Sequence, residues 1–176
     1  MRNFYKMNGS KHEICHNFFT NINSEEQAYL LGFYVADGNV NEKRKTFRVK
    51  INKEDSEIID LYKKYICPTA HTFIYNSYDI KGRNDKKYKG RDQISVDINS
   101  SVLVNSLVNL GYGYKKTYLN MSLPKIDDDL IIHFIRGYFD GDGCITKNIA
   151  YDSYNKPRLR LHFSFTAKNA SLFKDI

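Results

Sequence analysis

The chain has 176 residues, of which 41% are hydrophobic and 14% aromatic, so it can build one sizeable core or two small ones and is not a disordered protein. Lys and Arg outnumber Asp and Glu by 27 to 20, and the net charge of +7 favours a polyanionic partner. No apolar run approaches the ~20 residues that span a bilayer, and the three cysteines predict no disulfide framework. We therefore expect a soluble, intracellular protein without membrane partners.

The first 22 residues predict a polar N-terminal extension. They contain the run HEICH, with His12, Cys15 and His16. These side chains could be taken for half of a metal cluster, but the sequence offers no second half at zinc spacing.

Residues 23–129 predict one α+β unit in the order helix, two strands, helix, two strands, helix. Ser24 and Gln27 form a capping box at the start of the first helix, and the second helix follows Asp55 or Ser56. The segments HTFIYNSY and QISVDI read as the later strands, and Gly111 closes the last helix.

A basic loop separates those two later strands. Its cationic residues are Lys81, Arg83, Lys86, Lys87, Lys89 and Arg91. The composition fits an arm that contacts phosphates and also fits a plain solvated loop, and both interpretations stay open.

The chain repeats itself. The segment YLLGFYVADGNV from Tyr29 matches HFIRGYFDGDGCI from His133, and the Asp-Gly pairs at Asp37 and Asp142 lie 105 positions apart. Residues 130–176 therefore predict a second copy of the unit. It stops at the equivalent of Leu61, so we expect an incomplete copy whose apolar strand face is uncovered, and a chain that self-associates.

Small residues recur on one face of each repeated helix. Gly32 and Ala36 are four apart in the first copy, and Gly137 and Gly141 are four apart in the second. Small side chains at this spacing let two helix backbones approach closely. We expect these four residues to form the interface between the two units.

Each repeated helix then ends in Asp and Gly. Gly38 and Gly143 are suited to a left-handed turn. Asp37 and Asp142 lie at the negative ends of their helices, so bringing the two carboxylates together is unfavourable unless a divalent cation such as Mg²⁺ joins them. A solvated turn is the usual role of a single Asp-Gly pair, but two copies in one context favour metal binding.

Two strands alternate between polar and apolar residues, which gives each a basic, hydrogen-bonding face. A β-ribbon of this kind fits the major groove of DNA, where Arg reads guanine and Asn reads adenine. The predicted DNA-binding residues are Thr46, Arg48, Lys50 and Asn52 in the first unit, and Arg158, Arg160, His162, Ser164 and Thr166 in the second.

The segments LLGFYVADG and IRGYFDGDG resemble the two copies of the motif that defines the LAGLIDADG homing endonucleases. The resemblance runs from about Asn23 onward. It implies an αββαββα unit and a second, incomplete copy packed through the motif helices, with Asp37 and Asp142 as metal ligands. It also implies a basic residue at the active site, which is Lys116 or the adjacent Lys115, and a water-ordering role for Asn52. The remaining acidic position of the motif, Val35 in one copy and Asp140 in the other, is structural in that family.

These observations together predict a Mg²⁺-dependent endonuclease that hydrolyses phosphodiester bonds in a long duplex DNA site. The resemblance adds intron mobility as the biological role and a pseudo-symmetric monomer as the intact protein. Two alternatives remain, namely an RNA maturase that assists intron splicing and a non-catalytic DNA-binding regulator on the same scaffold.

Overall fold

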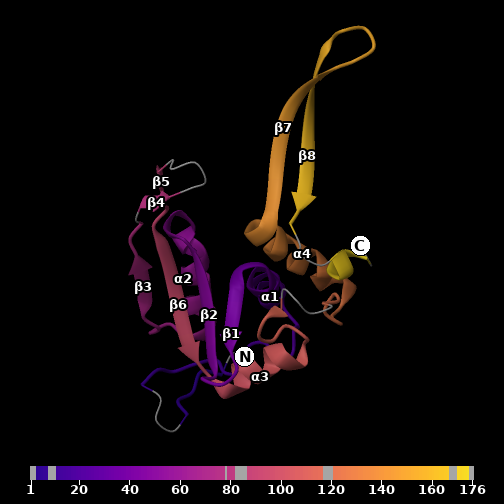
Figure 1. Ribbon diagram of the computed structural model, residues 1–176. Helices are drawn as coiled ribbons and strands as arrows, with labels where there is room; N and C mark the ends of the chain where they lie inside the picture. The colour runs from indigo at the N-terminus through magenta and orange to yellow at the C-terminus, as the bar shows by residue number, and fades with distance from the viewer. Residues whose placement is uncertain are drawn as a thin grey trace.

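A computed structural model describes residues 3–7, 11–77, 79–81, 87–116, 121–166 and 170–174. Figure 1 shows two parts that meet at a pair of helices, α1 and α4. One part is a four-stranded sheet with helices on one face, and the other is a long hairpin that projects from the end of α4.

The first part has the predicted order of elements. Its helices and strands are α1 (Glu25–Asp37), β1 (Gly38–Asn41), β2 (Thr46–Asn52), α2 (Ser56–Ile66), β3 (Thr72–Tyr75), β6 (Gln93–Asn99) and α3 (Ser101–Asn109). Half of the predicted capping box is present, because Ser24 Oγ accepts the Gln27 N–H. The return bond is shifted by one residue, since Gln27 Oε1 accepts the Asn23 N–H. Gly111 has a φ of +87° just beyond α3, which is the left-handed turn that stops a helix.

The four strands form an antiparallel sheet in the order β1-β2-β6-β3. Alternation along β2 directs Phe47, Val49 and Ile51 to the core. Phe47 stacks on Tyr34 of α1 and packs against Tyr62 of α2, so the helices cover this face of the sheet. The opposite face is open to solvent and carries the predicted DNA-binding residues of β2.

A short hairpin interrupts the basic loop, where the sequence predicts no regular structure. It consists of β4 (Asp79–Lys81) and β5 (Lys87–Lys89), and its backbone bonds pair the two strands. Arg83 and Lys86, two cations of that loop, lie outside the described residues.

The N-terminal segment is docked on the first unit and is apolar on its inner side, which the polar composition does not suggest. Tyr5 and Ile14 form an isolated antiparallel bridge, and the Cys15 N–H donates to the Ile66 carbonyl at 2.8 Å. Phe18 and Phe19 are buried in the core of the first unit. The bulky residues of HEICHNFF therefore pack inward, and only part of the extension faces solvent.

The second part consists of α4 (Asp128–Asp142), β7 (Gly143–Tyr151), β8 (Pro157–Phe165) and the short helix η3 (Ala170–Phe173). β7 and β8 pair in register from Gly143 and Phe165 at the base to Tyr151 and Pro157 at the tip. Every residue of β8 is exposed. Phe139 contacts Phe163 and Phe165, so only the base of the hairpin rests on α4.

The predicted α+β architecture is confirmed, with antiparallel sheets and two helix–strand–strand segments that pack through their helices. None of the helices within the described ranges has the length and apolar character needed to cross a bilayer.

Candidate catalytic and DNA-binding site

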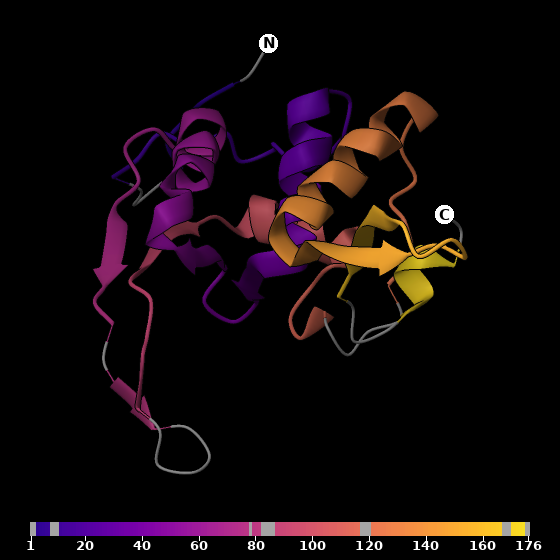
Figure 2. The same cartoon turned by 90° about the horizontal axis from the view of Figure 1, so that it is seen from above.

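The two repeated helices touch backbone to backbone at their glycines. A Cβ at Gly32 would lie 1.9 Å from the Phe134 carbonyl oxygen, and a Cβ at Gly137 would lie 1.9 Å from the Tyr29 carbonyl oxygen. Figure 2 shows α1 and α4 crossing side by side at this contact. Any side chain at Gly32 or Gly137 would push the helices apart.

The contact continues to the carboxyl ends of the helices. A Cβ at Gly141 would lie 2.5 Å from the Ala36 Cβ and 3.2 Å from Oδ2 of Asp37. The four small residues named from sequence therefore all lie at or beside the helix contact. Their packing brings the end of α1, which is Asp37, next to the end of α4, which is Asp142.

The glycines after the helices do not adopt the left-handed turn that we expected. Gly38 has φ −78° and Gly143 has φ −82°, both in the extended region, and the chain runs straight from each helix into a strand. Crowding explains these glycines instead. A Cβ at Gly38 would lie 2.1 Å from the Tyr34 ring, and a Cβ at Gly143 would lie 2.3 Å from the Phe139 carbonyl oxygen.

The two carboxyl groups hold their protons more tightly than usual. Desolvation, followed by repulsion from Asp142, raises the pKa of Asp37 to about 6. Desolvation also raises the pKa of Asp142. Each aspartate ends a helix whose last turn contains no basic residue, so the helix itself supplies no compensating cation.

Lys116 supplies a cation from outside the helices. Its side chain is 7% exposed, its ammonium group donates a hydrogen bond to the Gly38 carbonyl, and it lies 5.2 Å from the centroid of the Tyr34 ring. Burial lowers the pKa of Lys116 to about 8, although Asp37 and Asp142 pull it upward. Lys115 has φ +57° and places its ammonium group over the Tyr114 ring, so Lys116 is the lysine that interacts with the two aspartates.

A cavity of about 540 Å³ opens beside Asp37. Asn52 lines it, together with its cross-strand partner Gln93 and with Asp55, which precedes α2 and does not cap it. The sequence does not mark Gln93 or Asp55 as site residues. Gln93 can be found only from the register of β2 and β6. Asp55 follows Asn52 by three positions, and its sequence context indicates only the start of a helix.

Asp140 also faces this cavity, and it ties the helices together. Tyr29 of α1 donates a hydrogen bond to Asp140 Oδ2 at 2.9 Å, and the Arg136 guanidinium lies 4.9 Å from the centroid of the Tyr29 ring. When the repeat is aligned on Asp37 and Asp142, Tyr29 corresponds to Phe134 and Asp140 corresponds to Val35. Phe134 and Val35 are both buried. The hydrogen bond between Tyr29 and Asp140 thus joins the two helices at positions whose counterparts in the repeat are apolar and buried.

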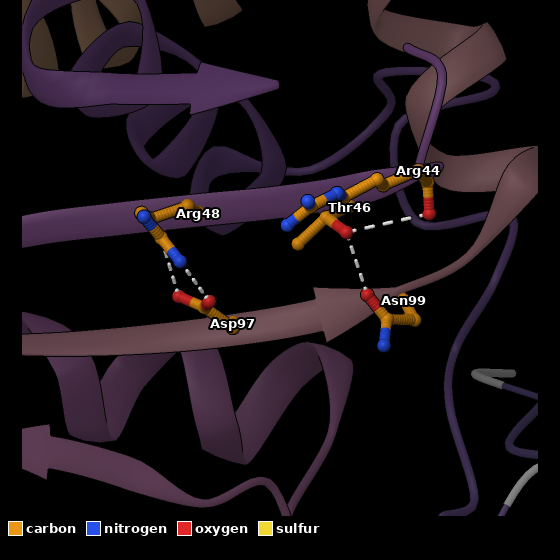
Figure 3. A network of polar contacts seen from close by, with 5 residues as sticks. All are labelled: Arg44, Thr46, Arg48, Asp97 and Asn99. Carbon is orange, nitrogen blue, oxygen red and sulfur yellow. Dashed lines mark hydrogen bonds and ion pairs between the residues drawn. The ribbon is translucent and has the colours of Figure 1, made fainter. Parts of the chain in front are cut away.

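The polar face of the first sheet is pre-ordered by side-chain pairs, which Figure 3 shows. Arg48 makes a two-point ion pair with Asp97, its cross-strand partner. Thr46 Oγ1 donates to Asn99 Oδ1 at 2.8 Å and lies 3.3 Å from the Arg44 carbonyl oxygen. Farther along β2, the Lys50 ammonium lies over the Tyr75 ring at 4.2 Å.

The polar face of the hairpin is fully exposed. Arg158 is paired with Asp152 at 2.9 Å, and Arg160 lies opposite Asn148 in the strand register. The remaining predicted residues on this side of the hairpin are His162, Ser164 and Thr166. The Thr166 N–H donates to the Asp142 carbonyl, so this row of side chains starts at the end of α4.

The chemistry of the donor atoms fits a hard divalent cation. Asp37 and Asp142 offer carboxylate oxygens, and Mg²⁺ is usually held by one or two carboxylates with water and phosphate oxygens completing its shell. Within the described ranges, no cluster of three or more His, Cys, Asp or Glu residues is placed to enclose a metal ion.

Comparison with models of known protein families gives no match. An uncharacterized protein of Methanocaldococcus jannaschii is 27% identical over 131 residues, which is 73% of this chain and 45% of that protein. The chain therefore spans less than half the length of this relative.

Several solved structures are similar. The LAGLIDADG meganuclease I-CpaMI bound to uncleaved DNA has a TM-score of 0.43 at 16% identity over 77% of this chain and 65% of that one. The I-SmaMI LAGLIDADG homing endonuclease bound to cleaved DNA has a TM-score of 0.44 at 14% identity over 88% of this chain and 70% of that one. These values describe a partial likeness of fold.

Proposed function

We propose that the protein is a site-specific endonuclease that hydrolyses phosphodiester bonds of duplex DNA with a divalent metal ion. The observation that supports this most strongly is the pairing of Asp37 and Asp142 at adjacent helix ends, with the buried Lys116 acting on both. Two carboxyl groups with raised pKa values beside a buried cation are characteristic of functional sites.

Asp37 and Asp142 would hold the ion, which would supply Lewis-acid stabilisation of the leaving oxygen and an activated water. Lys116 would offset the negative charge of the phosphate, because its ammonium group is already fixed by Gly38 and Tyr34. Asn52 and Gln93 would orient water in the cavity beside Asp37. The polar faces of β2 and β8 would bind the DNA on either side.

Cleavage of a plasmid library carrying random inserts, with Mg²⁺ and with EDTA, tests this proposal. We expect a subset of inserts to be cut only with Mg²⁺, and sequencing of the products should reveal one recurrent site. Binding of the library without any cutting would favour a DNA-binding regulator, and preferential binding of intron RNA over duplex DNA would favour a maturase. Either result would contradict the proposal.

A further inference from the structure

The docked N-terminal segment builds a feature that the proposed site does not use. A cavity of about 920 Å³ lies at the end of the first sheet where β6 finishes and β2 begins. Figure 1 shows the indigo N-terminal segment at this end of the sheet. Lys11 and His12 of that segment form one wall, and Asn41 and Thr46 of the sheet form another. We call this cavity the basic basin.

The basic basin carries a net positive charge. Its charged lining residues are Lys11, Arg44, Lys45, Arg48 and Asp97. The acidic residue among them, Asp97, forms an ion pair with Arg48, so the charges of these two residues offset each other. Lys11, Arg44 and Lys45 therefore remain as cations without a carboxylate partner among the described lining residues, and the Lys45 ammonium donates to Asn105 at 3.0 Å. His71 and Ser101, the first residue of α3, also line the cavity and add hydrogen-bonding groups.

The wall is fixed in place by a buried tie. The Nδ1 atom of His16 lies 2.7 Å from Ser100 Oγ, and His16 is 1% exposed. Burial lowers the pKa of His16. The contact of His16 with Ser100 links the N-terminal segment to the start of α3. Farther out, His12 Nδ1 lies 2.8 Å from Thr69 Oγ1, and the rings of His12 and His71 meet edge to face. These contacts at His12 and His16 anchor the segment directly C-terminal to Lys11.

The basic basin is continuous with the polar face of the sheet. Thr46 and Arg48 line it, whereas Lys50 and Asn52, farther along the same strand, line the cavity beside Asp37. Thr46 and Asn52 are separated by roughly 20 Å of strand at ~3.3 Å per residue. A duplex lying on this face would meet the candidate catalytic residues at one end and the cations of the basin at the other.

We infer that the basic basin binds a DNA backbone phosphate flanking the cleavage site, with Lys11 and Arg44 as its contacts and the N-terminal segment as part of the DNA-binding surface. This inference rests on the proposed function. It extends the interface beyond the strands to a contact that adds affinity without reading sequence, because phosphates carry no base information.

The salt dependence of binding to a random-sequence duplex tests the inference. Each phosphate contact contributes about −0.9 to the slope of log K against log salt. Lys11→Gln should make the slope shallower by about 0.9, and Lys11→Gln with Arg44→Gln by up to about 1.8. Lys64→Gln is the matched control, because Lys64 is an exposed lysine on α2, which covers the opposite face of the sheet. Its slope should equal that of the wild type.

The possible outcomes separate the two proposals. If the wild type binds duplex DNA and Lys11→Gln leaves the slope unchanged, the inference fails while the proposed function stands. The same holds if Arg44→Gln alone changes the slope, since the N-terminal wall would then play no part. If the wild type does not bind duplex DNA, both fail. The substitutions lie at exposed positions, and circular dichroism should show that each variant remains folded.

Discussion

The strands β2 and β8 have the same alternating sequence pattern and opposite surroundings. In β2 the apolar residues Phe47 and Val49 have no exposed surface, because the helices α1, α2 and α3 pack on this face of the sheet. In β8 the corresponding apolar row is bare, with Leu159 at 67% and Phe163 at 65% exposed. Alternation therefore fixes which face of a strand is apolar, but distant elements decide whether that face becomes a core.

The largest expected difference comes from placing an aspartate on the apolar face of each strand. Val49→Asp would bury a carboxylate without a partner, and we expect it to lower the free energy of unfolding by more than about 4 kcal/mol or to prevent folding. Leu161→Asp, on the apolar face of β8, should leave folding intact and reduce self-association through that face.

Thermal melting and light scattering of the two variants measure these effects. Equal destabilisation would show that the hairpin face is covered in solution. Unchanged scattering by Leu161→Asp would show that the face does not drive association.

The helix contact joins the two regions, and Gly137→Leu should disrupt it. Its Cβ would clash with the Tyr29 carbonyl oxygen, so α1 and α4 must separate. We expect a loss of about 3 kcal/mol or more in the free energy of unfolding, because overpacking against backbone has little room to relax. Ile132→Leu on the exposed side of the same helix is the control. Similar melting temperatures for both variants would refute the close contact.

The polar faces of the two strands are expected to behave alike, unlike the apolar faces. Arg48→Ala and Arg160→Ala should each weaken binding to the cognate site by ~1 to 3 kcal/mol and relax base preference at one position. Arg48 is paired with Asp97, so Arg48→Ala should also leave the Asp97 carboxylate unpaired. Arg160 lies opposite the uncharged Asn148, so Arg160→Ala should leave no such carboxylate on the facing residue. Binding selections on randomised sites measure both effects. A uniform loss across all sequences would mean that these arginines contact phosphates.

The smallest expected effect is the pH dependence of stability. The pKa of Asp37 is about 6 in the folded protein against an ordinary value of 3.8, so the folded state binds more protons between those values. Stability should therefore fall as pH rises through this window, and the penalty is fully present above pH 6.

Asp37→Asn removes this penalty. It should raise the free energy of unfolding at pH 7 by less than about 1 kcal/mol, because Asp37 lies at the surface and is screened by solvent, and it should give no gain at pH 4. Melts in metal-free buffer measure the difference. An equal gain at both pH values would contradict the raised pKa.

Much of the first unit could be predicted because its signals are local. The helix cap at Ser24 and the alternation of β2 each act within a few residues, and both are observed. The repeat added a long-range prediction, since two small-residue faces imply a contact between α1 and α4. The hairpin β4–β5 could not be predicted from the composition of the basic loop, because composition does not determine φ. The extended backbone at Gly38 and Gly143 could not be predicted either, because the crowding by Tyr34 and Phe139 depends on packing.

The candidate site was less predictable where it depends on strand register and on the N-terminal segment. Gln93 faces Asn52 only because β6 pairs with β2 in one register. Lys11 reaches the sheet only because Ile14, Phe18 and Phe19 dock the segment on the core. The polar composition of the first residues hides this docking, since the few apolar residues that anchor it show no regular spacing.

We expect Asp37 and Asp142 to act as one metal-dependent cleavage site, separate from the strands that bind DNA. Cleavage and affinity should be measured together, on one cognate duplex, for the wild type and for Asp37→Asn and Asp142→Asn. Each substitution should abolish cleavage with Mg²⁺ while the affinity for DNA falls little or rises, since the strands are untouched and repulsion from the phosphate is reduced. Equal losses of binding and cleavage, or cleavage that survives either substitution, would contradict it.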